Sequence, residues 1–91
     1  MLSYQIDSKL LKELRKIEKK DKKSYLNIIN KIQEIINSNE ETILNYKNLK
    51  KPLQYLKRVH INTQFILLFS YNSNTKTIIF ESYKHHDDAY K

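Results

Sequence analysis

Two histidines in the second half of the chain are the residues best suited to acid–base chemistry. His60 lies two residues after Arg58, and His86 lies close to the C-terminus. An imidazole takes up or releases a proton near neutral pH, and an arginine keeps its positive charge beside a phosphate. Metal-free cleavage of RNA needs a base for the ribose 2′-hydroxyl, an acid for the departing 5′-oxygen and a cation for the phosphate. These residues therefore suggest ribonuclease chemistry, although two histidines in a chain of 91 residues are also common as plain surface residues.

Basic and aromatic residues around the histidines could hold an RNA strand. Between residues 46 and 60 there are five lysines or arginines and no carboxylate. Lysine and arginine neutralise phosphates, and aromatic rings stack on unpaired bases. The candidates for substrate binding are Lys50, Lys51, Lys57, Gln64, Phe65, Lys84 and Tyr90, with Tyr83 as a further stacking ring. Each of them could equally be a packed or a solvated residue.

Other kinds of site fit the sequence less well. The chain has no cysteine, which excludes a thiolate zinc site, a cysteine nucleophile and disulfide bonds. It has no glycine, so glycine-rich phosphate loops and dinucleotide-binding motifs are excluded too. The run His85-His86-Asp87-Asp88 could suggest a metal site, but neighbouring residues of a strand point to opposite faces, and neither an EF-hand nor an HExxH spacing is present. We expect neither a metal nor a cofactor.

Size and charge narrow the choice of partners. A chain of 91 residues, 40% of them hydrophobic, predicts a single domain over residues 1–91 with a small core. The net charge of +7 and the pI near 9.6 favour a polyanionic partner, either a nucleic acid or an acidic protein. A merely solvated basic surface is the alternative. The sequence shows no signal peptide and nothing close to the roughly 18 apolar residues of a membrane span, so we expect a soluble, cytoplasmic protein.

Hydrophobic periodicity predicts that helices come first. A short strand at 4–6 precedes two helices, at 8–20 and 21–36, whose apolar residues recur at helical spacing. Almost no loop separates the two helices, so they should form a hairpin. Residues 39–54 show no sustained period and contain the only proline, which predicts a connecting segment.

Three strands are expected in the C-terminal half, at residues 55–61, 65–71 and 77–83. In the first of them Arg58 and His60 share one face, because a strand has a period of two residues. The second strand is apolar on both sides, as a central strand would be. Since there is no glycine, asparagine or aspartate should supply any positive φ, and this would explain the asparagines at the turn 72–74 and after the second helix. The expected fold is α+β, with a short N-terminal strand and a helical hairpin packed on one face of an antiparallel sheet.

Several short motifs resemble the RelE/ParE toxin superfamily, and within it the YafQ-like branch. The motifs are Lys51-Pro52-Leu53-Gln54, Arg58-Val59-His60-Ile61, the segment from Phe65 to Phe69, and His86 with Tyr90. The order of helices and strands is also similar, so the resemblance covers nearly the whole chain. It implies the fold of the RelE-like microbial ribonuclease toxins.

The resemblance implies that the chain is the toxin of a type II toxin–antitoxin system. RelE and YafQ toxins are ribosome-dependent endoribonucleases (mRNA interferases), which cleave mRNA in the ribosomal A site and so inhibit translation. Each is neutralised by a cognate antitoxin, expected here to be RelB/DinJ-like. Operator DNA would be contacted only through the antitoxin, and no membrane is involved.

The resemblance also implies roles for individual residues. His60 and His86 match the catalytic histidines of the YafQ branch, and Tyr90 stands where the family has an aromatic residue. His86 would be the general acid and His60 would help to activate the 2′-hydroxyl, although the two roles could be exchanged. Arg58 and Lys51 would stabilise the phosphate.

The chain departs from the toxin patterns at three positions. Lys51 stands where YafQ has a histidine, Gln64 where YafQ has an aspartate, and Ile66 where RelE has an arginine. Two alternatives therefore stay open. One is a ParE-like toxin that poisons DNA gyrase without cleaving RNA, although ParE-type chains lack the paired histidines. The other is a catalytically degenerate toxin that acts only as an antitoxin partner and co-repressor.

Overall fold

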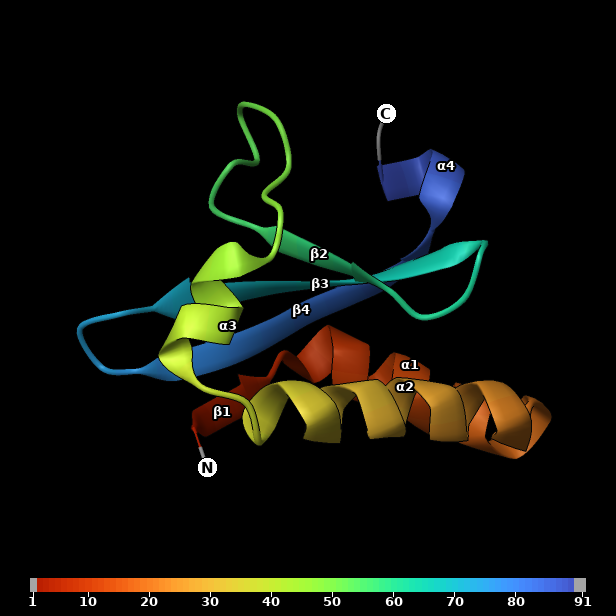
Figure 1. Ribbon diagram of the computed structural model, residues 1–91. Coiled ribbons are helices and arrows are strands. Elements are labelled where there is room, and N and C mark those ends of the chain that lie inside the picture. Colours follow the sequence, from red (N-terminus) through yellow and green to blue (C-terminus); the bar gives the residue numbers. More distant parts are fainter. Residues whose placement is uncertain (1, 90–91) are drawn as a thin grey trace.

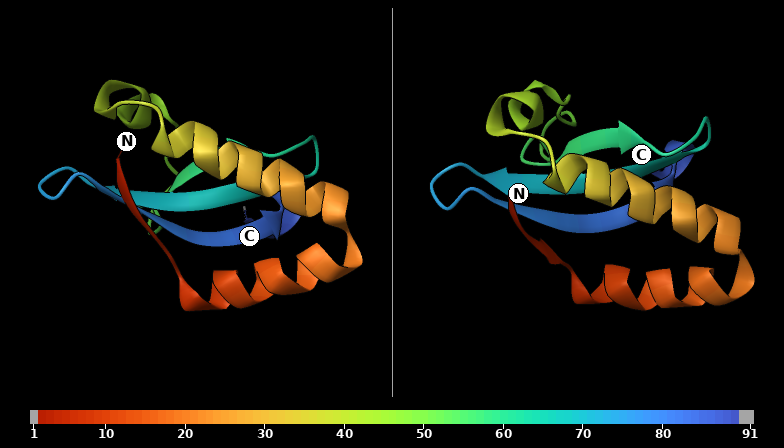
Figure 2. Two further views of the ribbon diagram at one scale, coloured as in Figure 1. Left: turned by 90° about the horizontal axis from the view of Figure 1, so that it is seen from below. Right: turned by 60° about the horizontal axis from the view of Figure 1, so that its bottom comes forward.

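A four-stranded sheet separates two layers of the protein (Figure 1). The computed structural model describes residues 2–89. The helices are α1 (Ser8–Lys20), α2 (Lys22–Ile36), α3 (Glu40–Asn45) and α4 (His86–Ala89). The strands are β1 (Ser3–Ile6), β2 (Lys57–His60), β3 (Phe65–Asn72) and β4 (Thr77–His85). Helices α1 and α2 lie side by side along one face of the sheet (Figure 2), whereas the loop 46–56 and α4 rise from the other side (Figure 1).

Asp21 joins α1 to α2 without a loop. Its N–H donates to the Ile17 carbonyl at 2.8 Å, which closes the last turn of α1. Its carboxylate accepts hydrogen bonds from the Ser24 N–H at 3.1 Å and the Ser24 hydroxyl at 2.6 Å, which caps α2. The buried residues of the hairpin recur at helical spacing, and they are Leu10, Leu14, Ile28, Ile32, Ile35 and Ile36. The predicted helical hairpin on one face of the sheet is confirmed.

The strands are ordered β1-β4-β3-β2, with β1 parallel to β4 and the other pairs antiparallel. Strand β3 is central, as predicted, and is buried on both faces. Leu67 and Phe69 belong to the core on the helix side. Ile66 and Leu68 belong to a second, smaller core under the loop 46–56. The two faces of the sheet therefore differ: one is covered by helices, and the other is covered only in part by a loop.

A bulge in β4 changes which residues face the helices. The register shifts between Leu68 and Phe69 of β3, and Glu81 is the extra residue on β4. An extra residue reverses the alternation of the side chains beyond it. Phe80 and Tyr83, although three residues apart, therefore both belong to the core on the helix side.

The expected limits of several elements are wrong. Residues 40–45 form α3 within the segment predicted to be irregular. Asn39 caps this helix by accepting a backbone hydrogen bond of 2.9 Å, and Ile43 is fully buried. A six-residue helix with one buried side chain is too short to show a period. In addition, β2 begins only at Lys57 and β4 continues to His85.

Positive φ falls on a lysine and not on an asparagine. Among residues 2–89 it occurs at Lys76, with φ 53°, in the turn between β3 and β4. Asn72 contributes to this turn as an acceptor, with bonds from the N–H groups of Asn74 (2.9 Å) and Thr75 (3.2 Å). Asn37 after α2 has φ −86°. The prediction that asparagines supply positive φ is therefore wrong. Asn72 stabilises its turn through its side-chain oxygen, and Asn37 adopts a right-handed backbone conformation.

Glu40 connects α3 to the turn between β3 and β4. Tyr71 Oη donates to its carboxylate at 2.6 Å, and Lys76 Nζ lies 3.2 Å from its other oxygen. The hydrogen bond from Tyr71, followed by that from Lys76, lowers the pKa of Glu40. The same hydrogen bond raises the pKa of Tyr71 to about 12.

We expect Tyr71→Phe to remove a pH-dependent stabilisation. A carboxyl group whose pKa is lowered by folding stabilises the native state above its ordinary pKa of 4.5, and this stabilisation is lost as the pH falls through the lowered value. The wild type should therefore melt at a higher temperature than Tyr71→Phe at neutral pH, and the difference should shrink as the pH falls below 4.5. Circular dichroism measures both melting temperatures. Tyr55→Phe, at an exposed tyrosine, is the control, and a difference that does not change with pH would refute the prediction.

Candidate functional site

The candidate residues of β2 lie on the face of the sheet that α1 and α2 leave uncovered. Residues opposite each other on neighbouring strands point to the same face. His60 is opposite Ile66 in β3, Ile66 is opposite Lys84 in β4, and Arg58 is opposite Leu68. Ile66 and Leu68 belong to the smaller core, away from the helices. Arg58 and His60 therefore share this face. Lys84 starts from it as well, but its side chain lies at the edge of β4, where it also approaches Glu13 of α1.

His86, the first residue of α4, places its ring against His60. The two ring centroids lie 5.8 Å apart with an interplanar angle of 27°, a stacked arrangement. The N–H of His86 donates to the carbonyl of Gln64 at 2.7 Å, which fixes the start of α4 beside the turn between β2 and β3. His60 is exposed, and the His86 side chain keeps 43% of its surface exposed. Both imidazoles are therefore accessible to a substrate.

Asp87 lies beside two histidines. One carboxylate oxygen is 3.7 Å from Nδ1 of His86, and the other is 3.7 Å from Nδ1 of His85. The carboxylate of Asp87 therefore lies on the Nδ1 side of the His86 ring. Sequence reasoning considered Asp87 only as a metal ligand. The signal that could have identified it is an acidic residue directly after a candidate catalytic histidine.

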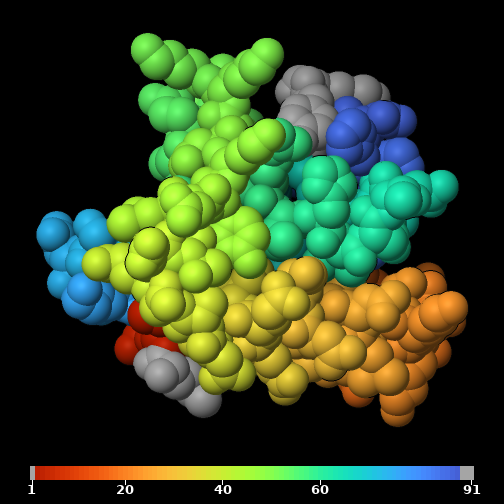
Figure 3. Space-filling model, viewed as in Figure 1, coloured from red at the N-terminus to blue at the C-terminus, as the bar shows by residue number. Residues whose placement is uncertain are grey.

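The loop 46–56 carries two lysines of the predicted set. It rises from the same side of the sheet as α4 (Figure 1) and projects as a ridge in the space-filling view (Figure 3). A hydrogen bond of 2.9 Å from the Leu49 N–H to the Leu56 carbonyl closes its base, and both leucines are buried in the smaller core. Lys50 and Lys51 are exposed on this loop. Their charges thus lie on the side of the sheet that carries the histidine pair.

Lys57 holds the start of the loop 46–56 and does not face the histidine pair. Its side chain is buried, and its ammonium donates to Asn48 Oδ1 at 3.1 Å and to the Tyr46 carbonyl at 3.3 Å. Burial lowers the pKa of Lys57. Lys57 is opposite Phe69, which faces the helices, so it lies on the other face from His60. The structure therefore does not bring Lys57 to the histidine face, and we do not include it among the phosphate ligands.

Phe65 also lies away from the histidine pair. Its ring stacks on the ring of Tyr83, with centroids 4.9 Å apart and an interplanar angle of 6°. It also makes an edge-to-face contact with the ring of His85, with centroids 5.4 Å apart. Phe65 packs against the helix-side core, and Tyr83 is buried in it. The two rings thus contact each other, and we do not include Phe65 among the base-stacking residues.

The turn between β2 and β3 positions the carbonyl that receives the His86 N–H. Asn62 Oδ1 accepts the N–H groups of Gln64 at 2.8 Å and Phe65 at 3.0 Å. The Gln64 side chain is exposed at the edge of the site. Sequence reasoning missed Asn62, although an asparagine between two strands is a typical turn acceptor. Tyr90 lies outside the described residues.

Residues 2–89 contain neither a cluster of metal ligands nor a helix that could span a membrane. No group of three or more His, Asp or Glu side chains in this range is arranged to hold a metal ion. No helix in the same range is long and apolar enough to cross a membrane.

Solved structures with this fold include bacterial toxins. YafQ from E. coli strain BL21(DE3) superposes with a TM-score of 0.66 at 13% identity, with 100% of both chains covered. A metal-bound toxin from Helicobacter pylori gives a TM-score of 0.64 at 18% identity, over 97% of this chain and 98% of that one. A chain of the RelBE2 toxin–antitoxin complex from Mycobacterium tuberculosis gives a TM-score of 0.62 at 14% identity, over 93% of this chain and 98% of that one. The fold is therefore that of the YafQ and RelE class of toxins.

Two proteins are similar to the chain in sequence over its length. The protein named "Putative toxin RelE4" of Methanocaldococcus jannaschii is 42% identical over 91 residues, which are 100% of this chain and 93% of that protein. An uncharacterized protein of Methanosarcina mazei is 40% identical over 90 residues, which are 99% of this chain and 100% of that protein. No family model matches the chain. The identity to the RelE4 protein shows that the chain belongs to the RelE-like toxin superfamily.

Proposed function

We propose that the chain is the toxin of a toxin–antitoxin pair and a metal-independent endoribonuclease that cleaves mRNA in the ribosomal A site. The observation that carries this proposal is the stacked pair of His60 and His86. The two rings come from elements far apart in the sequence, lie 5.8 Å from each other and are both accessible. Membership of a toxin superfamily supports the same activity.

The spacing of the two rings suits a single phosphodiester. A hydrogen bond from an imidazole spans about 2.8 Å. Two rings 5.8 Å apart can therefore reach the entering and the leaving oxygen of the same phosphate.

The proposed reaction is an in-line attack by the neighbouring hydroxyl. His60 accepts the proton of the ribose 2′-hydroxyl, and the 2′-oxygen forms a bond to phosphorus. The bond from phosphorus to the 5′-oxygen breaks, and His86 donates a proton to that oxygen. The products are a 2′,3′-cyclic phosphate and a free 5′-hydroxyl. Asp87, 3.7 Å from Nδ1 of His86, would orient the ring so that Nε2 transfers the proton.

Positive side chains on the same side of the sheet would stabilise the phosphate. Arg58 shares the face of His60, and its planar guanidinium can bind two phosphate oxygens at once. Lys51 stands on the ridge formed by the loop 46–56, where it could approach the same phosphate. Lys50 and Lys84 would hold the phosphates of flanking nucleotides.

An antitoxin is the proposed protein partner. RelBE2 from Mycobacterium tuberculosis, which has this fold, is a toxin–antitoxin complex. We propose that this chain pairs with an acidic antitoxin of the RelB/DinJ type, since its own net charge is +7. The same charge suits the ribosome and mRNA, and only the antitoxin would contact operator DNA.

Primer extension in a translation reaction tests the proposal. The wild type should produce new mRNA ends within codons, only while the mRNA is translated. His60→Ala/His86→Ala, shown by circular dichroism to be folded, should produce none. Undisturbed translation with the folded wild type would refute the proposal. In that case, inhibition of DNA supercoiling would identify a gyrase poison, and its absence would leave the degenerate antitoxin partner that Lys51 and Gln64 permit.

A further inference from the structure

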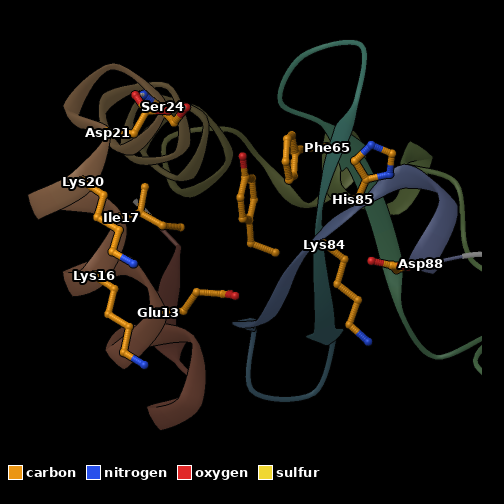
Figure 4. Close-up of a pocket in the computed structure, with 11 residues that line it drawn as sticks. Glu13, Lys16, Ile17, Lys20, Asp21, Ser24, Phe65, Lys84, His85 and Asp88 are labelled. Carbon is orange, nitrogen blue, oxygen red and sulfur yellow. Dashed lines mark hydrogen bonds between the residues drawn. The ribbon is translucent and has the colours of Figure 1, made fainter.

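Most of the tyrosine and phenylalanine rings in residues 2–89 contact the core on the helix side. Three of them belong to this core and four more pack against it, and they are Phe69, Phe80, Tyr83, Tyr25, Tyr46, Phe65 and Tyr71. Tyr4 meets the ring of Phe80 edge-on, with centroids 6.4 Å apart. In the close-up (Figure 4), Phe65 lies across a cavity from Ile17 of α1. Packing on the helix side therefore accounts for all eight of these rings.

Tyr55 is the exception in this part of the chain. Its side chain is 61% exposed, more than any other exposed large hydrophobic residue within 2–89. Its ring makes no contact with another aromatic ring of these residues. A single exposed tyrosine is common on protein surfaces. The position of Tyr55 therefore decides whether it has a role.

Tyr55 lies on the loop 46–56, close to the start of β2. The next residue, Leu56, is buried in the smaller core, and Arg58 follows two residues later. Three residues of chain span at most about 10 Å, so Tyr55 stays close to Arg58. β2 runs from the foot of this loop toward α4 (Figure 1), where His60 meets His86. Tyr55 is therefore at the rim of the histidine site.

Hydrogen bonds brace the tip of this loop. The N–H of Leu53 donates to the Lys50 carbonyl at 2.9 Å, and the N–H of Leu56 donates to the Leu53 carbonyl at 3.0 Å. Two turns thus follow each other. Asn48 Nδ2 donates to the Gln54 carbonyl at 2.8 Å, which ties the tip to the first arm of the loop. A ring carried by a braced loop loses little conformational freedom when it binds.

The surroundings of this ring favour RNA over a protein. From residue 42 to residue 80 the chain has six lysines or arginines and no carboxylate, and Lys50 and Lys51 are exposed on the same loop. A flat ring between cations suits an unpaired base with its phosphates. A peptide needs an apolar groove or an open strand edge. The start of β2 is already paired on its outer edge, where the Arg58 N–H donates to the Lys47 carbonyl at 3.0 Å.

We propose that Tyr55 stacks on an unpaired base of the mRNA that flanks the scissile phosphate and so positions the strand on the histidine pair. Stacking tolerates every base, and its preference follows stacking strength. A purine should therefore be favoured over a pyrimidine at this position. The identity of the ligand as mRNA rests on the proposed function. The base-binding ring itself rests on the exposure, the bracing and the charge of the loop.

The test compares two substitutions of Tyr55. Tyr55→Leu removes the ring but keeps an apolar side chain, whereas Tyr55→Trp keeps a ring. The probe is a short 2′-O-methyl oligoadenosine, which lacks the attacking hydroxyl and cannot be cleaved. Tyr55→Leu should bind it at least about fivefold more weakly than the wild type, and Tyr55→Trp within about threefold. Tyr4→Leu, at an exposed tyrosine on the other edge of the sheet, is the matched control and should bind like the wild type.

A second probe separates stacking from a structural effect. A 2′-O-methyl oligouridine should bind the wild type more weakly than the oligoadenosine does, because a pyrimidine stacks less strongly. The difference between the two probes should shrink in Tyr55→Leu. Circular dichroism first shows that each variant is folded. An undiminished difference in Tyr55→Leu, or equal affinity of Tyr55→Leu and the wild type for the oligoadenosine, would overturn the proposal.

Tryptophan fluorescence gives an independent measurement. The chain has no tryptophan, so Tyr55→Trp introduces a single one. The oligoadenosine should quench its emission and should leave the emission of Tyr4→Trp unchanged. Unchanged emission of Tyr55→Trp, or no binding by the wild type, would overturn the proposal. Equal quenching by polyglutamate would also overturn it and would assign the ring to an acidic peptide.

These measurements do not depend on RNA cleavage, because neither probe has a free 2′-hydroxyl. A chain that stacks on the oligoadenosine through Tyr55 but leaves mRNA intact would refute the nuclease and keep the base-binding ring. A chain that cleaves mRNA, but whose Tyr55→Leu variant binds both probes like the wild type, would refute the role of Tyr55 alone.

Discussion

His60→Ala and His86→Ala should each lower the rate of mRNA cleavage by about 10²- to 10⁴-fold, the usual contribution of one general acid or base. Because both rings would act on one phosphate, the double variant should lose little more than either single variant. Single-turnover kinetics on ribosome-bound mRNA measure the three rates. Melting curves must first show that each variant is folded.

The third histidine of the chain offers a matched control for this comparison. His85 precedes His86 directly. Its ring contacts Phe65 on the opposite face of the sheet and accepts the N–H of Asp87 at 3.3 Å, but it makes no described contact with the ring of His60 or of His86. His85→Ala should therefore cleave at close to the wild-type rate. A loss as large as that of His86→Ala would point to a general disturbance of α4. Full activity in His60→Ala or His86→Ala would rule out the proposed role of that residue.

Arg58→Ala should lower the rate of the cleavage step by about 10²- to 10³-fold, because it removes a cation placed where charge develops on the phosphate. The cleavage rate of Arg58→Lys should lie between those of Arg58→Ala and the wild type, because lysine keeps the positive charge but lacks the planar guanidinium that binds two phosphate oxygens. Titration with ribosomes separates kcat from KM, and the loss should fall mainly on kcat.

Arg15 is the matched control for Arg58. It is the other arginine of the chain and is exposed on α1, on the opposite side of the sheet. Arg15→Ala should leave kcat close to that of the wild type. A loss in Arg58→Ala that appears only in KM would show that Arg58 binds the mRNA without stabilising the transition state.

The sequence predicted the parts of the fold that repeat regularly. The helical hairpin has a clear period, and Asp21 is a recognisable cap between its helices. Alternation along β2 placed Arg58 and His60 on one face, which agrees with the register between β2 and β3. The same alternation argues against Lys57, which is one residue before Arg58 and therefore faces the helices.

Other features depend on contacts that local patterns do not contain. The bulge at Glu81 reverses the faces of β4, so the neighbours of Tyr83 and His85 could not be read from alternation. The stacking of His86 on His60 depends on where β4 ends and on a hydrogen bond to Gln64. Phe65 was expected to face RNA bases because it is aromatic, but only its position in the sheet shows that it packs against Tyr83.

The most direct test of the nuclease uses purified ribosomes that hold end-labelled mRNA with an empty A site. The wild-type chain should cleave within the A-site codon and leave a 5′ fragment that ends in a 2′,3′-cyclic phosphate. His60→Ala and His86→Ala should each slow this reaction by at least about 100-fold. Intact mRNA in the presence of the folded wild type, or equal rates for the wild type and both histidine variants, would refute the proposed nuclease.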